Sequence, residues 1–583
     1  MPHFSALSSW PRADQTFETG PSSHIAFFRN ILKSLNATLD PSQTDSHIEG
    51  HLGCIKPEFF PPSSMFCNET RVCSELSKEL DSSSEGDVHI LPKWPSIVLL
   101  LRQFFRGYGW ITPFMDEESF VQTRIKKIYE GSQDPKASLL ALLNITLAIG
   151  AITSIETVDP VGRRVWLAKK FYRRARDLCT QAAGQPVELE LVQTLLLMTQ
   201  YLQITENCAN SWATHGLAVQ AAFRMGLHTV KSLSGLDLPE QECRKRTWYT
   251  CVILDRMLSM EFGRPTLVPR MEEPISFWTN DKRCEISSPG VPSDGTRDTT
   301  CFRFFVHFSE LYEILYDVLN ALYWQEYPQN RSQVFKIMSR IADHEQALDS
   351  WRANIPAPFR IDGADKIENT SCDTDISINL VKMLSLHYQK IRSLIHQPIL
   401  LYFLWRQAQA QDLMQTEEIE DLTILCQPSL QISAVTYTAM TSLASSLNHD
   451  KIVPGMWWTS SGYGKSFFNA VLACFAHLVL QVQDRKGQLQ HPISTPELKG
   501  CISLATQALS KLAFGHPAVP RVTELLRRIL EVSDCLTQRD WANSQAIYGM
   551  ASFDIGANWS ELDNVVGSAY EIFNTVDPHV QSA

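Results

Sequence analysis

Apolar residues recur three and four positions apart from Leu91 to about Ser533, the spacing that places them on one face of an α-helix. Runs that alternate apolar and polar residues between hairpin turns are absent from this stretch, and strands do not alternate with helices. We therefore predict an all-α fold, a large multi-helix domain with polar breaks at 280–300 and 360–375. The predicted helices lie near 93–108, 117–130, 137–155, 161–182, 188–204, 209–227, 239–262, 302–324, 332–353, 376–405, 427–447, 465–484, 495–512 and 519–536.

Three segments differ in composition. Residues 1–90 contain 15 serines and short polar runs, which predicts a mostly disordered linker. Within it, apolar residues at helical spacing from Ile25 to Leu35 predict one short helix at about 24–36 that docks on something larger. Residues 91–536 form the predicted helical body, in which 44% hydrophobic residues overall are enough to bury a core. Residues 537–583 form an acidic-aromatic tail.

Charge limits the partners of the chain. Its 52 Lys and Arg residues are outnumbered by 63 Asp and Glu residues, a net charge of −11. A protein that wraps nucleic acid over its whole surface would be basic, so any contact with DNA must be local or supplied by a partner. Seven basic residues do gather in 163–176. They suggest a nuclear-import patch or a phosphate contact, although a solvated face of a packed helix is the favoured interpretation.

The C-terminal tail has an unusual composition. Residues 540–583 contain no Lys or Arg, and six acidic residues are interleaved with six aromatic residues. Acidic neighbours keep bulky apolar groups accessible, as in disordered activation segments. A tail folded back onto the helical body fits the composition equally well.

Motifs for catalysis or metal binding are missing from the sequence. No Cys-x-x-Cys pair occurs among the 14 cysteines, so we expect no zinc site, and no cofactor, metal or catalytic residue is predicted. Ser461–Ser466 superficially resembles a phosphate loop, but Thr459 replaces its first glycine and no sheet supports it, which favours a loop that opens a helix. His215 is expected to be a hydrogen-bonded core residue. The protein is therefore predicted not to be an enzyme.

Two apolar segments raise the question of a membrane. Residues 137–155 carry no charge over 19 positions, yet polar residues and Gly150 interrupt them, which favours a buried helix of a helical protein. Residues 467–482 are shorter and contain Asn469 and His477. The first residues lack the pattern of a secretory signal. We expect a soluble intracellular protein without a membrane partner.

The helix predicted at 239–262 has clear boundaries. Asp237 can cap its start, Pro239 fits the first turn, and Gly263 followed by Pro265 ends it. Asp255 falls on the same face as apolar residues, and a buried carboxylate is costly without a partner. Its candidate partners are Arg256 and Arg264, or N–H groups of the turn at 263–265. The structural signature is predicted to be Trp248, Asp255, Arg256, Gly263, Arg264 and Pro265.

Several motifs resemble a known family. They are Pro113–Phe120, Val192–Gln203, Ser211–Val219, Arg224–His228, the block from Glu242 to Pro265 that contains Arg244–Trp248 and Leu254–Arg256, and Leu386–Pro398. In this order they resemble the middle homology region of fungal zinc-cluster transcription factors. In that family this helical regulatory domain follows a binuclear zinc module that binds DNA.

The resemblance implies a nuclear transcription regulator that controls a metabolic or secondary-metabolite gene cluster. Its implied partners are the transcription machinery or co-regulators, and a dimer with a zinc-cluster regulator. The family's six clustered cysteines are missing here, although 20–29 is similar to the segment that commonly follows them. Either the regulator works without its own DNA reader, or the gene model starts too late. The alternative is a truncated partner or inhibitor of a complete zinc-cluster regulator; DNA would then be reached only through that partner.

Overall fold

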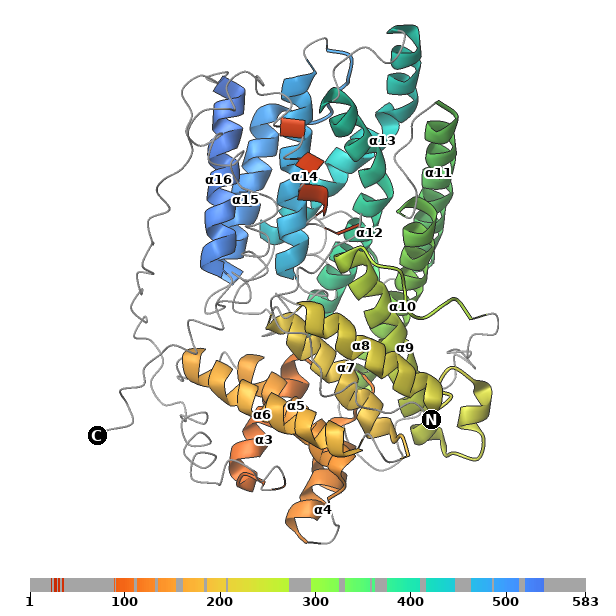
Figure 1. Ribbon diagram of the computed structural model, residues 1–583, viewed down its shortest axis with the longest axis vertical. Helices are drawn as coiled ribbons and strands as arrows, with labels where there is room; N and C mark the ends of the chain where they lie inside the picture. Colours follow the sequence, from red (N-terminus) through yellow and green to blue (C-terminus); the bar gives the residue numbers. More distant parts are fainter. Residues whose placement is uncertain are drawn as a thin grey trace, which may run out of the picture.

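The computed structural model describes most of the chain between residues 89 and 538 and part of a short N-terminal segment. The described residues are 22–23, 26–28, 30–31, 34–35, 89, 91–109, 113–131, 135–153, 161–182, 186–205, 208–271, 295–323, 331–356, 359–361, 375–408, 416–445, 463–484, 487–512 and 519–538. Every regular element in these ranges is a helix, which confirms the predicted all-α fold (Figure 1). The C-terminal tail predicted at 540–583 lies outside the described residues.

The helices follow one another along the chain. They are α3 (Trp94–Gly107), the π-helix η3 (Ser119–Ile125), α4 (Lys126–Tyr129), α5 (Ala137–Thr153), α6 (Val161–Ala182), α7 (Leu189–Ile204), α8 (Cys208–Arg224), the 3-10 helix η4 (Val230–Leu233), α9 (Leu238–Phe262), α10 (Gly295–Leu322), α11 (Arg331–Asn354), α12 (Asp375–Ala408), α13 (Thr416–Ser445), α14 (Tyr463–Gln483), α15 (Thr495–Leu512) and α16 (Val519–Gln538). Most bounds fall within a few residues of the prediction.

Three boundaries were predicted wrongly. The helix expected at 117–130 is a π-helix that continues into α4. Helix α13 begins eleven residues before the predicted start at 427, because Pro428 lies inside the helix and does not begin it. Helix α10 begins at Gly295, inside the polar break predicted at 280–300. In the last two, tertiary packing overrides the local signal of proline, glycine and polar residues.

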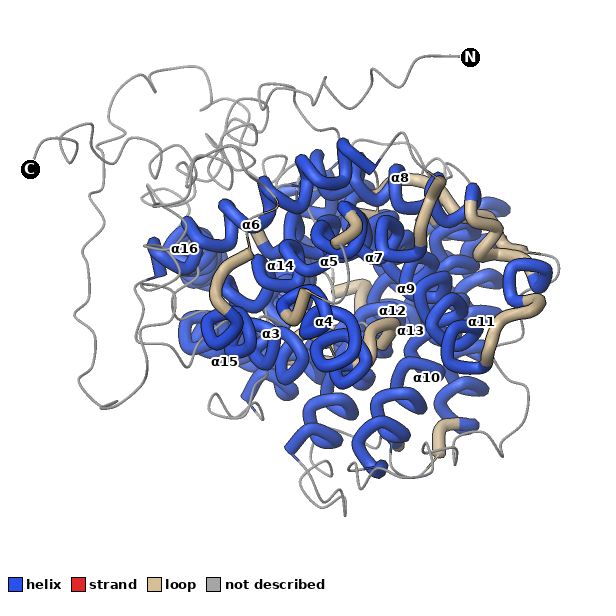
Figure 2. Tube along the Cα trace, turned by 90° about the horizontal axis from the view of Figure 1, so that it is seen from below, coloured by secondary structure: helices blue, strands red, loops and turns tan. Residues whose placement is uncertain are grey.

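The helices form two bodies joined by a central set (Figures 1 and 2). Helices α3 to α8 make one body, in which α5 contacts α3, α6 and α7. Helices α12 to α16 make the other, with α13, α14 and α15 in mutual contact and α16 beside α15. Helix α10 contacts α9 on one side and α11 and α12 on the other, so it links the two bodies.

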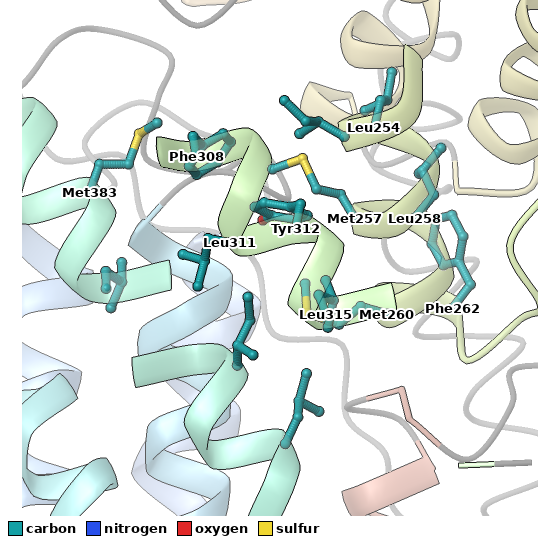
Figure 3. Close-up of a cluster of buried hydrophobic side chains, with 14 of the residues drawn as sticks. Leu254, Met257, Leu258, Met260, Phe262, Phe308, Leu311, Tyr312, Leu315 and Met383 are labelled. Atoms are coloured by element: carbon teal, nitrogen blue, oxygen red, sulfur yellow. The ribbon is translucent and has the colours of Figure 1, made fainter. Parts of the chain in front are cut away.

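One hydrophobic core runs through both bodies and their link. Figure 3 shows its central part, where side chains of α9, α10 and α12 meet: Leu254, Met257, Leu258, Met260, Phe262, Phe308, Leu311, Tyr312, Leu315 and Met383. Each of these side chains is almost fully removed from solvent. Because burial of apolar area is the main favourable term in folding, the two bodies are expected to fold as one unit.

Helix α5 lies at the centre of the first body. Nearly all of its residues are buried, so the protein surrounds it on every side. Gly150 lies against α3, and a Cβ atom at this position would come within 2.3 Å of the carbonyl oxygen of Leu100. A glycine is therefore required where the two helices cross. Among the described residues one helix, Gly464–Gln483, is long and apolar enough to cross a membrane, but 72% of its most apolar window is buried inside the protein; α5 is shorter.

The basic helix α6 differs in one respect from its predicted pattern. Ala168, Phe171 and Ala175 are buried and Arg173 is exposed, as the periodicity predicts. Arg174, however, is buried, because it lies three residues after Phe171 and four before the buried Leu178 on the same face. The seven basic side chains therefore do not all lie on the solvated half of this helix.

The N-terminal segment, meaning the described residues between 22 and 35, lies against the second body. Those from 26 onward are helical, and Phe27, Phe28, Ile31 and Leu35 are buried. Ser34 connects this segment to two helices: its hydroxyl donates to the carbonyl of Leu404 at 2.9 Å, and its own carbonyl accepts from Nε2 of Gln483 at 3.0 Å. The segment is thus attached by both apolar and polar contacts.

Candidate functional site

Helix α9 has the boundaries that its sequence indicates. The Asp237 carboxylate accepts the N–H of Glu240 at 3.0 Å and so caps the first turn. At the other end Gly263 has φ 63° and ψ 36°, a left-handed conformation that favours glycine. The N–H of Arg264 then donates to the carbonyl of Ser259 at 3.1 Å, which closes the end of the helix.

Asp255 and Arg256 form an ion pair in the interior of the protein. Nη1 of Arg256 lies 2.7 Å from Oδ2 of Asp255. Asp255 is 0% exposed and Arg256 is 1% exposed. The carboxylate also accepts the N–H of Leu267 at 2.9 Å and that of Val268 at 3.1 Å. Two charges without water are tolerated only when they are paired and their remaining atoms are hydrogen-bonded.

The partner predicted for Asp255 is correct in part. Arg256 is the partner, whereas the N–H donors come from Leu267 and Val268 and not from the turn at 263–265. The turn reverses the chain, and only the residues after it pass beside Asp255. The guanidinium of Arg256 donates to the carbonyl of Val268 as well. Each of the two charged side chains therefore binds the chain that leaves α9 at residues 264–268, which we call the exit loop.

Two further contacts extend the ion pair to neighbouring helices. Cζ of Arg256 lies 4.2 Å from the ring centroid of Tyr316 in α10, a cation–π contact. Nε2 of His215 in α8 lies 3.5 Å from Oδ1 of Asp255. Its ring is fully buried, as predicted, but this long contact stands in place of the predicted hydrogen bond. Burial alone would raise the pKa of the Asp255 carboxyl, but His215, Arg256 and the N–H of Leu267 hold this pKa below its ordinary value.

Trp248 and Arg264 of the predicted signature join α9 to α8. The ring of Trp248 meets that of Phe223 edge to face, with 5.6 Å between centroids. Cζ of Arg264 lies 5.6 Å from the ring centroid of Trp212, and Trp212 itself contacts Phe262 edge to face at 6.1 Å. The signature residues therefore hold α8, α9, the exit loop and α10 together; Pro265 is exposed on that loop.

A second polar cluster lies at the end of α9, and we call it the polar junction. Its centre is Glu261, which is buried and paired with Lys465 of α14. Nε2 of Gln203 in α7 donates to the other oxygen of Glu261 at 3.4 Å. This carboxylate thus connects the first body to the second.

The polar junction encloses a small cavity of about 20 Å³ that Lys390, Tyr437 and Asn469 also line. That volume corresponds to about one water molecule. Burial lowers the pKa of the Lys390 amine to about 8, the charge of Glu261 raises it, and that of Lys465 lowers it. This amine therefore loses its charge at a lower pH than an exposed lysine does.

The N-terminal segment reaches the polar junction through Ser22. The Ser22 hydroxyl donates to the carbonyl of Met260 at 3.3 Å, and it lies 3.5 Å from that of Ser259. The last carbonyls of a helix have no partner within the helix, so this serine satisfies the Met260 carbonyl at the end of α9. Ser22 and Phe27 also line the cavity of the polar junction.

The polar contacts of α9 can hold the first body, the second body and the N-terminal segment together, but they offer little for catalysis. Its carboxylates are bound to cations, and among the described residues no group of three His, Cys, Asp or Glu side chains could hold a metal ion. Lys465 of the loop that resembles a phosphate loop is paired with Glu261, and Ser466 is buried. Both lie at the start of α14, which begins at Tyr463 as a helix and not as a phosphate cradle.

The Asp255 pair was predictable from the sequence, whereas the polar junction was not. Glu261 and Lys465 are separated by 204 residues, and no spacing rule connects them. One signal was present, since Glu261 is the only charged residue between Met257 and Phe262. Ser22 gave no comparable signal, because its function depends on the helix end that it reaches.

Comparison with known proteins shows what part of this helical assembly is similar to. Residues 101–353 match the fungal specific transcription factor domain. The chain is 26% identical over 330 residues to "Transcription factor FBD3" of Fusarium pseudograminearum, covering 55% of this chain and 42% of the relative. It is 24% identical over 368 residues to the "ABC-transporter-regulating transcription factor" of Aspergillus oryzae, covering 62% and 39%. It is 24% identical over 337 residues to "Sorbicillinoid biosynthetic cluster transcription factor 2" of Penicillium rubens, covering 56% and 46%.

The fold and the match agree, because the described part of residues 101–353 is all-helical and matches the fungal specific transcription factor domain. The matched region runs from α3 to the end of α11 and contains every signature residue from Trp248 to Pro265. Residues 101–353 thus match the kind of domain that the sequence motifs indicated. It spans less than half the length of the curated relatives named above.

Proposed function

We propose that this chain is a transcription regulator of fungal type that acts through its helical regulatory domain and is not an enzyme. The observation that carries the proposal is the match of residues 101–353 to the fungal specific transcription factor domain. The geometry supports it, because the charged residues of α9 are used to join helices. A rigid body that connects distant segments suits a protein that transmits a regulatory signal.

We propose further that the regulated genes form a metabolic or secondary-metabolite cluster. The support is that one relative is named for a biosynthetic cluster and another for the regulation of an ABC transporter. Deleting the gene for this chain should change the transcripts of a contiguous set of genes. Changes scattered over the genome without such a set would argue against a cluster-specific regulator.

The proposed place of action is the nucleus, and the proposed partners are transcription machinery or co-regulators and a dimer with a zinc-cluster regulator. Chromatin crosslinking of the tagged chain should recover promoters of the affected genes. Recovery that requires a second, zinc-cluster protein would favour the alternative, a partner or inhibitor that does not bind DNA itself. A tagged chain that stays out of the nucleus under all growth conditions would contradict both.

The proposed division of the chain is a linker at 1–90, the regulatory domain at 91–536 and a tail at 537–583. We assign recruitment of transcription machinery to residues 540–583, which carry six acidic residues and no Lys or Arg. Fused to an unrelated DNA-binding module, this tail should activate a reporter, and replacing both Trp559 and Phe573 with Ala should abolish activation. A silent fusion, or full protection of the tail from proteolysis in the whole protein, would favour a tail folded back onto the body.

A further inference from the structure

A second cavity lies away from α9, between α11, α12 and α13. Its volume is about 150 Å³, and we call it the α11–α13 cavity. It is lined by Arg352 of α11, Ile361, Ser385, Tyr388 and Gln389 of α12, and Ala439 and Leu443 of α13. A cavity of this volume accommodates a molecule about the size of benzene.

Two buried polar atoms of the α11–α13 cavity lack the partner they need. The Tyr388 hydroxyl proton meets no acceptor, and Oε1 of Gln389 meets no donor, within the part of the chain that the structure describes. Tyr388 is 1% exposed, so water outside the protein cannot supply the acceptor. Buried polar groups are almost always hydrogen-bonded, and such an exception requires an explanation.

The Tyr388 ring is held in place and cannot turn to find another acceptor. It stacks on Trp351, with 6.0 Å between ring centroids and 14° between planes. The same ring has a second contact, because Cζ of Arg352 lies 6.0 Å from the Tyr388 ring centroid. The hydroxyl is therefore fixed in advance of binding, as expected for a recognition group.

The charges around the α11–α13 cavity favour an anion. Arg352 is an exposed cation at the lining, whereas the nearby carboxylate of Glu345 is already bound by Arg392 at 2.9 Å and lies 3.1 Å from Nε2 of His396. Burial raises the pKa of the Tyr388 hydroxyl, and the charge of Asp349 raises it as well, but Asp349 does not line the cavity. A carboxylate placed between Arg352 and Tyr388 would accept from both groups.

We propose that the α11–α13 cavity binds a small monocarboxylate with an apolar body. The carboxylate accepts hydrogen bonds from Arg352 and the Tyr388 hydroxyl, and the apolar body lies against Ile361, Ala439 and Leu443. Helix α11 belongs to the matched domain, and α12 and α13 follow that domain in the chain. An occupant would therefore connect the matched domain to the helices that follow it. Only this regulatory consequence rests on the proposed function; binding itself does not.

The test is calorimetric titration of the full chain with benzoate as the probe. Saturable binding of one benzoate per chain is expected, together with at least tenfold weaker binding of benzamide, which has the same size but no charge. Acetate should also bind at least tenfold more weakly, since it lacks the apolar body. A chain that is folded by circular dichroism but binds neither benzoate, hexanoate nor cyclohexanecarboxylate would overturn the proposal.

Variants locate the site. Arg352→Gln and Tyr388→Phe should each weaken benzoate binding about tenfold, and Ala439→Leu should abolish it by filling the cavity. Arg352 is exposed, so its variant is expected to fold even if Tyr388→Phe does not. The matched control is Val435→Leu, on an exposed position of the same helix α13, which should leave affinity unchanged. Equal affinity in wild type, Arg352→Gln and Ala439→Leu would show that benzoate binds elsewhere and would overturn the proposal.

Discussion

Replacing Asp255 with Ala should destabilise the protein strongly. The carboxylate is fully buried, and its removal leaves the guanidinium of Arg256 with only the carbonyl of Val268 and the face of Tyr316. It also removes the acceptor of the N–H groups of Leu267 and Val268. Breaking one partner of a buried ion pair costs about 3–5 kcal/mol. The orphaned N–H groups put this variant at the upper end of that range.

The assay is thermal unfolding followed by circular dichroism. At about 2 °C per kcal/mol, the lower end for large domains, Asp255→Ala should lower the Tm by roughly 8–10 °C. Asp255→Asn should lie between wild type and Asp255→Ala, because its side-chain oxygen can still accept one N–H. The control is Asp317→Ala, which breaks the exposed pair with Arg270 and should cost about 1 kcal/mol or less. Equal melting of wild type and Asp255→Ala would refute a buried, structural ion pair.

Three other perturbations follow from the structure. Gly150→Ala should lower the Tm by several degrees, because its Cβ would meet backbone of α3, whereas Gly500→Ala, with nothing nearby, should raise it slightly in the same melting experiment. Ile31→Ala should cost about 2–5 kcal/mol of docking of the N-terminal segment and speed its cleavage in limited proteolysis; an unchanged digest would contradict that docking. Lys390 carries a lowered pKa, so from about pH 8 to pH 10 the unfolded chain retains a proton that the folded protein has released. Relative to Lys390→Met, the free energy of unfolding of the wild-type protein should therefore rise by about 3 kcal/mol over this interval in chemical denaturation; an equal pH dependence of the two proteins would contradict a buried Lys390 amine.

The periodicity of apolar residues was enough to predict most helices. Capping residues then fixed the ends of α9, where Asp237 and Gly263 act as their residue types suggest. Local signals failed where packing on a distant helix decides the outcome. Pro428 lies within α13, and Arg174 turns inward although it belongs to a basic run.

The candidate site was predictable only where one element contains both partners. Asp255 on an apolar face called for a cation, and its neighbour Arg256 supplies it. The polar junction needed contacts between α7, α9 and α14, and the α11–α13 cavity needed three helices and their connection. Neither has a fixed spacing in sequence, because each depends on how helices from different parts of the chain cross.

The most direct test of the central claim is to tether the full chain to an unrelated DNA-binding module and measure reporter transcripts. A transcription regulator should change the transcript level relative to the module alone, in either direction. The Asp255→Ala variant should lose this effect in proportion to its loss of folded protein. Transcript levels equal to those of the module alone, from a fusion that is folded and present in the nucleus, would contradict the assignment of this chain as a regulator.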